Sequence, residues 1–175
     1  QCEQALGGYA AEDQVRDEVQ ETVHASIAKL IHASDKSSCI AMVASATDGW
    51  TKLFYSFCER QKHKENFEGR QKVILISQAD YAANVVAACR YANLNSDWTI
   101  LMIPSTSRND GAGGGEVVTT GKVDLEQLDQ MLSGSYTYVD KDAEVRLNPR
   151  DIKMVCVTHI PTNSGIVNDV EAIGL

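Results

Sequence analysis

The sequence lacks the features of a membrane, secreted or nucleic-acid-binding protein. It contains no apolar run long enough to span a bilayer, and no basic-then-apolar leader opens it. Basic residues are few: 16 Lys and Arg stand against 24 Asp and Glu, for a formal net charge of -8. Nucleic acids and anionic membranes reward clustered positive charge. We therefore expect a cytoplasmic protein that has neither a nucleic acid nor a membrane as its partner.

Patterns typical of disulfide frameworks and metal sites are also missing. The five cysteines are odd in number, scattered along the chain and without a CxxC pair. No combination of His and Cys has the spacing of metal ligands. We expect reduced cysteines, as in the cytosol, and no bound metal.

Motifs for nucleotide binding and serine hydrolysis are incomplete or absent. Residues 115–122 imitate a Walker loop, but five residues instead of four separate Gly115 from Gly121, and Val123 stands where Ser or Thr must bind magnesium. Residues 111–115 do not complete G-x-G-x-x-G, and no Gly-x-Ser-x-Gly elbow occurs. We expect neither activity.

What is present is an ordinary globular composition, with 43% apolar and 23% charged residues among 175. This length suits a single domain, or most of one. Apolar periodicity predicts β-α-β-α-β alternation, and therefore an α/β fold with a parallel sheet and right-handed crossovers. Residues 105–121 are expected to form a mobile surface loop, and 133–150 an insertion. The expected elements are a long helix with an apolar stripe of Val15, Val19, Val23, Ile27, Leu30 and Ile31; a strand at Cys39–Ala44; a helix with Trp50, Leu53, Phe54 and Phe57; a strand at Val73–Ile76; a helix at Tyr81–Ala92; a strand at Trp98–Ile103; and a helix at Val123–Leu132.

The first candidate site is Ser45-Ala46-Thr47-Asp48-Gly49, where the predicted strand turns into a helix. Unpaired backbone N–H groups and the positive end of the helix dipole favour a phosphate there. The alternative is that Thr47 simply caps the helix. The Asp48 carboxylate would repel a phosphate, so we expect it to point away.

The second candidate is Ser77–Asn84, again between a strand and a helix. The aromatic ring of Tyr81 could lie on a planar ligand bound over the sheet edge. The alternative is that Tyr81 covers the core, with its hydroxyl in water.

The third candidate follows the run Ile152, Val155 and Val157, which predicts a buried strand. Small polar and turn-forming residues come next, from Pro161 to Gly165, and Asn168 or Asp169 can cap a helix that holds Val170 and Ile173. Ligands of α/β sheets bind beyond the carboxyl ends of the strands. We therefore interpret the segment as a binding edge rather than a plain connection. The alternative for His159 is a core histidine satisfied by the backbone.

The run Thr-His-Ile-Pro-Thr-Asn-Ser-Gly-Ile-Val-Asn at 158–168 resembles the class V aminotransferases, the pyridoxal-phosphate enzymes that include cysteine desulfurases, selenocysteine lyases and isopenicillin-N-epimerase-like proteins. The first two candidate segments resemble motifs of the same family, in the expected order. The resemblance implies the three-layer αβα large domain of fold type I, with a mainly parallel sheet, and pyridoxal 5'-phosphate as cofactor. It implies that Ala46, Thr47 and Asp48 hold the phosphate, that Tyr81 stacks on the pyridine ring, and that Thr162 and Asn163 contact the ring oxygen.

The resemblance also bears on the reaction and the assembly. Desulfurases usually carry His at the position of Tyr81, which favours an epimerase-like or C–S-lyase-like branch, although desulfurase and aminotransferase chemistry stay open. Gly8 and Tyr9 lie in a Gly-Gly-Tyr segment similar to one near the substrate entrance of the epimerase-like branch, and His159 is a further candidate for the substrate side. The substrate would be an amino acid, and the full-length parent a homodimer.

The resemblance places two essential residues beyond this chain. The family's Schiff-base Lys and its Asp on the pyridine nitrogen both follow the segment that ends at Asn168, and the lysines Lys52, Lys72 and Lys153 match neither position. We therefore expect a fragment, the front part of the large domain, that contains no catalytic residue and is inactive alone. The alternative is a catalytically inactive module that binds a phosphate or cofactor in a regulatory or interaction role.

Overall fold

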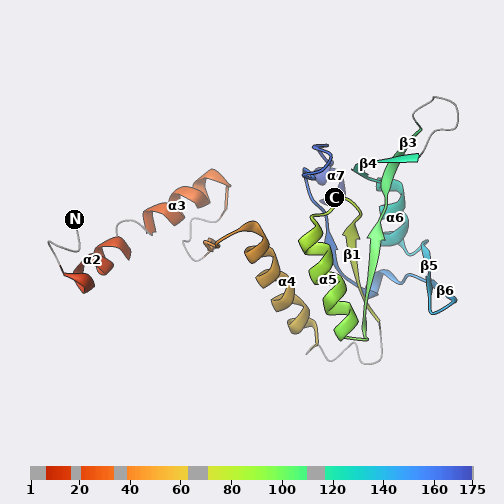
Figure 1. Ribbon diagram of the computed structural model, residues 1–175, viewed down its shortest axis with the longest axis horizontal. Coiled ribbons are helices and arrows are strands. Elements are labelled where there is room, and N and C mark those ends of the chain that lie inside the picture. Colours follow the sequence, from red (N-terminus) through yellow and green to blue (C-terminus); the bar gives the residue numbers. More distant parts are fainter. Residues whose placement is uncertain (1–6, 17–20, 34–38, 63–70, 110–116, 175) are drawn as a thin grey trace. The chain divides into compact units, whose positions relative to one another are not determined.

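The computed structural model describes residues 7–16, 21–33, 39–62, 71–109 and 117–174. Where the sequence predicts a single domain, the chain divides by its contacts into two units, Gln1–Asp48 and Gly49–Leu175. Figure 1 draws both, and each is described here by itself. Within the described ranges, no helix combines the length and the apolar character needed to cross a membrane.

The centre of the larger unit is a parallel sheet of three strands in the order β2-β1-β7. The middle strand, β1, is buried along its whole length, as its continuous apolar sequence predicts. Ile74 of β1 lies opposite Ile100 on one neighbour and Met154 on the other. The mixed α/β class and the parallel pairing are therefore confirmed. The strands are β1 (Lys72–Ser77), β2 (Trp98–Ile103) and β7 (Ile152–Cys156).

Helices cover both faces of this sheet (Figure 1). Because successive side chains of a strand point to opposite faces, Ile74 and Ile76 of β1 pack toward α4 and α5, whereas Val73 and Leu75 pack toward α6. Asp124 caps α6 by accepting a hydrogen bond from the Gln127 N–H at 3.1 Å. The three helices are α4 (Ala46–Lys62), α5 (Ala82–Leu94) and α6 (Leu125–Ser133).

Two predictions about strands are wrong. Residues 40–44 form no strand, and Met42 and Val43 are 62% and 43% exposed. An apolar run becomes a strand only where a neighbour pairs with its backbone, and none does so within the described residues. The strand after Ile152 exists, but Val155 is 38% exposed. β7 pairs only with β1 in the described part of the chain, so it is an edge strand.

The predicted loop at 105–121 is a β-hairpin instead. β3 (Ser105–Asn109) pairs antiparallel with β4 (Val117–Val123), and residues 110–116 between them lie outside the described residues. The segment expected as an insertion holds a second hairpin, β5 (Thr137–Asp140) with β6 (Ala143–Arg146), and a short 3-10 helix at Pro149–Asp151. Four consecutive β-branched residues, from Val117 to Thr120, favour the strand β4.

The smaller unit contains α2 (Gly8–Gln14) and α3 (Glu21–Leu30). The apolar stripe predicted for a long helix is largely exposed: Val23 is 40% and Leu30 78% accessible. Whether one helix continues from α2 into α3 involves residues 17–20, including Val19, which lie outside the described residues. The last element of the chain is α7 (Val170–Gly174), capped by the Asp169 carboxylate as predicted.

Candidate functional site

The tip of β1 is tied to the tip of β2 at the carboxyl edge of the sheet. The Gln78 N–H donates to the Ile103 carbonyl at 2.9 Å, and the Gln78 side-chain oxygen accepts from the Ser105 N–H at 3.1 Å. These bonds fix the path of the chain from Ser77 to Tyr81, where α5 begins. The second candidate segment is therefore held in place by the backbone at the end of β2.

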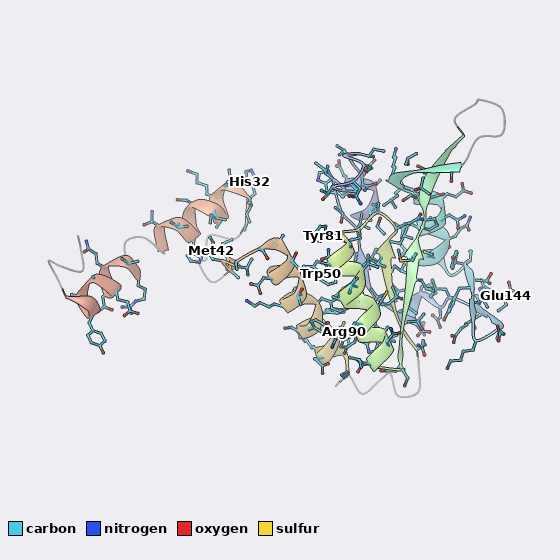
Figure 2. All side chains as sticks on the ribbon, viewed as in Figure 1. His32, Met42, Trp50, Tyr81, Arg90 and Glu144 are labelled. Carbon is cyan, nitrogen blue, oxygen red and sulfur yellow. The ribbon has the colours of Figure 1, made fainter. Side chains whose placement is uncertain are left out.

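Tyr81 occupies the amino end of α5 (Figure 2) and is 53% exposed. Its backbone N–H donates to the Asp80 carboxylate at 2.7 Å, and the same oxygen accepts from the Asn84 side chain at 2.9 Å. This exposure fits both predicted roles, a ring that stacks on a ligand and a ring that covers the core with its hydroxyl in water. Both roles stay predictions.

The loop after β7 forms a compact turn around Pro161, which is buried. The carbonyl of Pro161 accepts hydrogen bonds from the N–H groups of Ser164 at 3.3 Å and Gly165 at 2.8 Å. Gly165 has a φ of +64°, a conformation that favours glycine. Thr162 and Asn163 lie exposed on this turn. We refer to residues 161–165 as the Pro161 turn.

The Pro161 turn and the β1 tip meet at Gly121 of β4. A Cβ atom at Gly121 would lie 2.6 Å from Ser164 Oγ and 3.7 Å from Ala79 Cβ. The loop after β7 and the loop after β1 therefore both approach one residue of the β-hairpin. Of the three predicted strand tips, the second and third converge.

A buried asparagine that the sequence offered only as a possible cap anchors this arrangement. Asn168 is 2% exposed, and its side chain bonds to both β4 and the chain leaving β7. Asn168 and Gly121 are the residues that sequence reasoning missed at this edge. A buried Asn gives no local signal, because its partners lie far away in the chain.

The first candidate segment spans the boundary between the two units: Ser45 to Asp48 belong to the smaller one, and Gly49 begins the larger one. Ser45, not Thr47, caps α4: its hydroxyl accepts from the Asp48 N–H at 3.1 Å. The capping alternative is thus wrong in its residue, and the Thr47 hydroxyl is not used for the cap. Ala46 and Thr47 are exposed at the helix start, and Asp48 is half-buried. Their approach to Tyr81 and Thr162, and the orientation of the Asp48 carboxylate, stay predictions.

The candidates for the substrate side are also exposed. His159 is not a core histidine; it lines an open cavity of about 360 Å³ together with Lys122, Asp169 and Glu171. The backbone carbonyl of His159 accepts a hydrogen bond from the Asn168 N–H at 2.8 Å. Gly8 and Tyr9 begin α2 in the smaller unit, and Tyr9 is 90% exposed. Their role toward a substrate stays a prediction.

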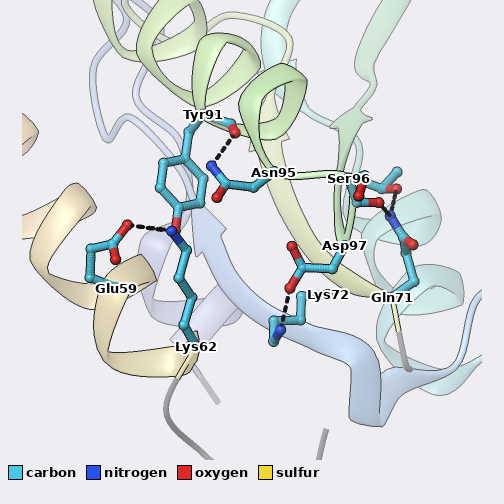
Figure 3. Close-up of polar contacts among 9 residues, drawn as sticks. Glu59, Lys62, Gln71, Lys72, Tyr91, Asn95, Ser96 and Asp97 are labelled. Atoms are coloured by element: carbon cyan, nitrogen blue, oxygen red, sulfur yellow. Dashed lines mark hydrogen bonds and ion pairs between the residues drawn. The ribbon is translucent and has the colours of Figure 1, made fainter. Parts of the chain in front are cut away.

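The lysines considered in the sequence are engaged elsewhere. Lys72 is buried and paired with Asp97 near the start of β2, at the opposite edge of the sheet (Figure 3). The ammonium group of Lys153 donates to the Arg150 carbonyl. Lys122 is an amine at the carboxyl edge that sequence reasoning did not consider. Within the described part of the chain, no three His, Cys, Asp or Glu side chains gather closely enough to hold a metal ion.

The two loops that meet at Gly121 thus carry an exposed aromatic side chain, Tyr81, and an exposed hydroxyl and amide, Thr162 and Asn163. That all three reach one ligand stays a prediction. Comparison with protein-family models, with curated proteins and with solved structures finds no match to this chain.

Proposed function

We propose that this chain is the front part of the large domain of a pyridoxal-phosphate-dependent enzyme similar to the class V aminotransferases, of the three-layer fold type I. The observation that carries the proposal is the meeting of the β1 tip and the Pro161 turn at Gly121, with Tyr81, Thr162 and Asn163 exposed beyond them. The resemblance of residues 158–168 adds the identity of the ligand.

The residues at this edge fit the cofactor chemically. An aromatic ring that is 53% exposed offers a stacking face for a pyridine ring. The hydroxyl of Thr162 and the amide of Asn163 offer hydrogen bonds to a ring oxygen, and both are accessible. The N-terminus of α4, a helix of 17 residues, carries N–H groups that suit a phosphate at Ala46 and Thr47. That the same cofactor reaches these groups is part of the proposal. When bound, the cofactor supplies an electron sink for bonds at the α-carbon of an amino acid.

Each of these groups has its own role toward the cofactor. Thr47 and the α4 backbone bind the phosphate, Tyr81 excludes water from one face of the ring, and Thr162 or Asn163 orients the ring through its oxygen. Lys52, Lys72 and Lys153 do not match the family's Schiff-base position, and no role in turnover is proposed for them. The parent would act on an amino acid in the cytoplasm, as a homodimer.

Binding of pyridoxine 5'-phosphate tests the proposal. This ligand lacks the aldehyde, so Lys122 cannot trap it, and calorimetry or quenching of tryptophan fluorescence can follow it. We expect saturable binding, weaker binding of pyridoxine without phosphate, and a loss of about fivefold in affinity for Tyr81→Ala but not for Tyr81→Phe. Thr47→Val should weaken binding, whereas the matched control Thr51→Val, one turn further along α4, should not.

Absence of binding, or equal affinity for pyridoxine with and without its phosphate, would overturn the proposal. The alternative is a module that binds the cofactor and catalyses no reaction. It predicts the same binding results but no turnover by the parent protein. It would be favoured if the parent protein, supplied with pyridoxal 5'-phosphate and amino acids, bound the cofactor and left every amino acid unchanged.

A further inference from the structure

The side chain of Asn168 joins two segments that are distant in the sequence. Its Oδ1 accepts a hydrogen bond from the Val123 N–H of β4 at 2.8 Å, and its Nδ2 donates to the Thr158 carbonyl at 2.8 Å. The backbone N–H of Asn168 donates to the His159 carbonyl, also at 2.8 Å. The residue is 2% exposed; its bond to Val123 is buried and its bond to Thr158 is partly buried.

These bonds close the base of the loop that carries the Pro161 turn. Thr158 and His159 stand where the chain leaves the sheet, and Asn168 stands where it enters α7. The loop between them therefore begins and ends at one fixed point, which is itself attached to β4. Among the described residues, a second contact between the Pro161 turn and the hairpin is the packing of Ser164 against Gly121.

The packing at Gly121 sets the distance between the turn and the hairpin. Gly121 has a φ of +80°, and a Cβ there would lie 2.6 Å from Ser164 Oγ and 2.8 Å from Ser164 Cβ. Such a contact would push the turn away from β4. Two residues therefore determine the position of the Pro161 turn. Asn168 attaches the base of its loop to β4, and Gly121, which has no side chain, lets the turn approach β4 closely.

We propose that Asn168 is a positioning residue: by fixing the Pro161 turn to β4, it sets where the Thr162 hydroxyl and the Asn163 amide lie over the sheet edge. This inference rests on the proposed function, in which those two groups recognise the ring oxygen of the cofactor. Both side-chain polar atoms of Asn168 already bond to the backbone, so we assign it no direct hydrogen bond to the cofactor. Its effect is on the discrimination of the ring oxygen, rather than on the phosphate, which other residues hold.

The test compares three ligands: pyridoxine 5'-phosphate, its analogue without the ring hydroxyl, and pyridoxine. We expect the unaltered chain to prefer the hydroxyl-bearing phosphate over the deoxy analogue by about three- to tenfold, the range of one net hydrogen bond. Asn168→Ala should reduce this preference below twofold while the preference for the phosphate over pyridoxine persists. A residue that only stabilised the fold would weaken all three ligands together.

A second variant keeps the test decisive if Asn168→Ala does not fold. Gly121→Ala displaces the same turn without touching Asn168, and it should lower the ring-oxygen preference in the same way. The matched control is Asn148→Ala, which removes an exposed side chain that bonds only the Arg150 N–H and stands far from the turn in sequence. Its ligand preferences should equal those of the unaltered chain.

Hydrogen exchange of the Ser164 and Gly165 N–H groups gives a readout that needs no ligand. Faster exchange in Asn168→Ala, with unchanged exchange in β1, supports the attachment; unchanged exchange overturns it. If the unaltered chain binds none of the three ligands, the proposed function fails and the positioning role fails with it. If it binds them and the Asn168→Ala and Gly121→Ala variants keep the ring-oxygen preference, the positioning role alone fails.

Discussion

The two faces of the parallel sheet are built from different side chains. The face under α4 and α5 is aromatic and sulfur-rich, with Phe54, Tyr91, Trp98, Cys58 and Cys156 in its core. The face under α6 is aliphatic and is filled by residues such as Leu75, Ile103, Leu128, Met131 and Leu147. Both cores are well buried, so burial alone does not distinguish them.

Geometry and ionisation distinguish the two faces. On the aromatic face, Trp50 stacks on Phe54 with ring centroids 4.7 Å apart, and Phe54 meets Tyr91 edge to face at 5.8 Å. Such pairs add about 0.5–1.5 kcal/mol to the area they bury. The aliphatic face depends on shape and volume. The aromatic face should therefore be more sensitive to both substitution and pH.

The largest effect is expected from Phe54→Ala. Phe54 is 1% exposed and contacts three aromatic rings, so its removal leaves a cavity and breaks the ring contacts. We expect a loss of about 3–5 kcal/mol in the free energy of unfolding, measured in urea. The neighbouring Leu53 is 69% exposed, and Leu53→Ala should cost less than about 0.5 kcal/mol. Equal losses in the two variants would contradict the assignment of Phe54 to the buried face of α4 and of Leu53 to its exposed face.

A smaller effect is expected on the aliphatic face from Met131→Ala. Met131 is fully buried, whereas Leu132 beside it is 41% exposed. Deleting the Met131 side chain should cost about 2–4 kcal/mol, and Met131→Leu less than about 1.5 kcal/mol, because the volume is conserved. Leu132→Ala is the matched control. If Met131→Ala lowered the free energy of unfolding more than Phe54→Ala does, the aliphatic face would be the more sensitive of the two.

Alkaline pH should destabilise the chain through the aromatic face. Burial raises the pKa of the Cys58 thiol and of the Cys156 thiol from 9.0 to about 12; the neighbouring Cys156 and Glu59 add to the shift at Cys58, and Asp80 adds to that at Cys156. The unfolded chain ionises these thiols first. Stability is therefore complete below pH 9 and declines between pH 9 and pH 12, by about 1 kcal/mol per thiol at pH 10.

Urea midpoints at pH 7 and pH 10 measure this decline. Cys58→Ala should lose part of the pH dependence, whereas Cys89→Ala, at an exposed position, should keep all of it. Burial also raises the pKa of Tyr91 on the aromatic face and of Tyr138 beside the aliphatic core, so both phenols add to the decline above pH 10. An unchanged midpoint between pH 7 and pH 10 would show that the thiols are not buried.

The smallest effect is expected at the rim of the aromatic face. The Lys62 ammonium lies 2.7 Å from a Glu59 carboxylate oxygen and 5.3 Å from the centre of the Tyr91 ring (Figure 3). Both charged side chains are partly exposed, so Lys62→Ala should cost only about 0.5–1 kcal/mol. Lys62→Arg should retain most of it. Thermal unfolding at low and high salt checks the electrostatic share, which salt should reduce.

Local patterns predicted the elements whose stability is local. The run from Val73 to Ile76 indicated a strand, and Asn168 or Asp169 a helix cap; the strand is found, and Asp169 is the cap. The helix predicted from Val123 begins at Leu125. The wrong predictions concern segments whose structure depends on pairing with another strand. Residues 40–44 have no pairing partner among the described residues, and 105–121 contain a hairpin where composition indicated a loop. For the site, the sequence predicted an exposed turn with Thr162 and Asn163 but not its anchor.

The sequence by itself determined an α/β chain whose continuous apolar run becomes the buried central strand, with small polar residues after each strand end. Only the tertiary structure decided that β7 is an edge strand, that β1 and β7 end beside one glycine, and that Asn168 binds β4. The physical reason is distance along the chain. Strand periodicity and caps act within a few residues, whereas the Asn168 and Val123 partners are 45 residues apart and meet only after the sheet has formed.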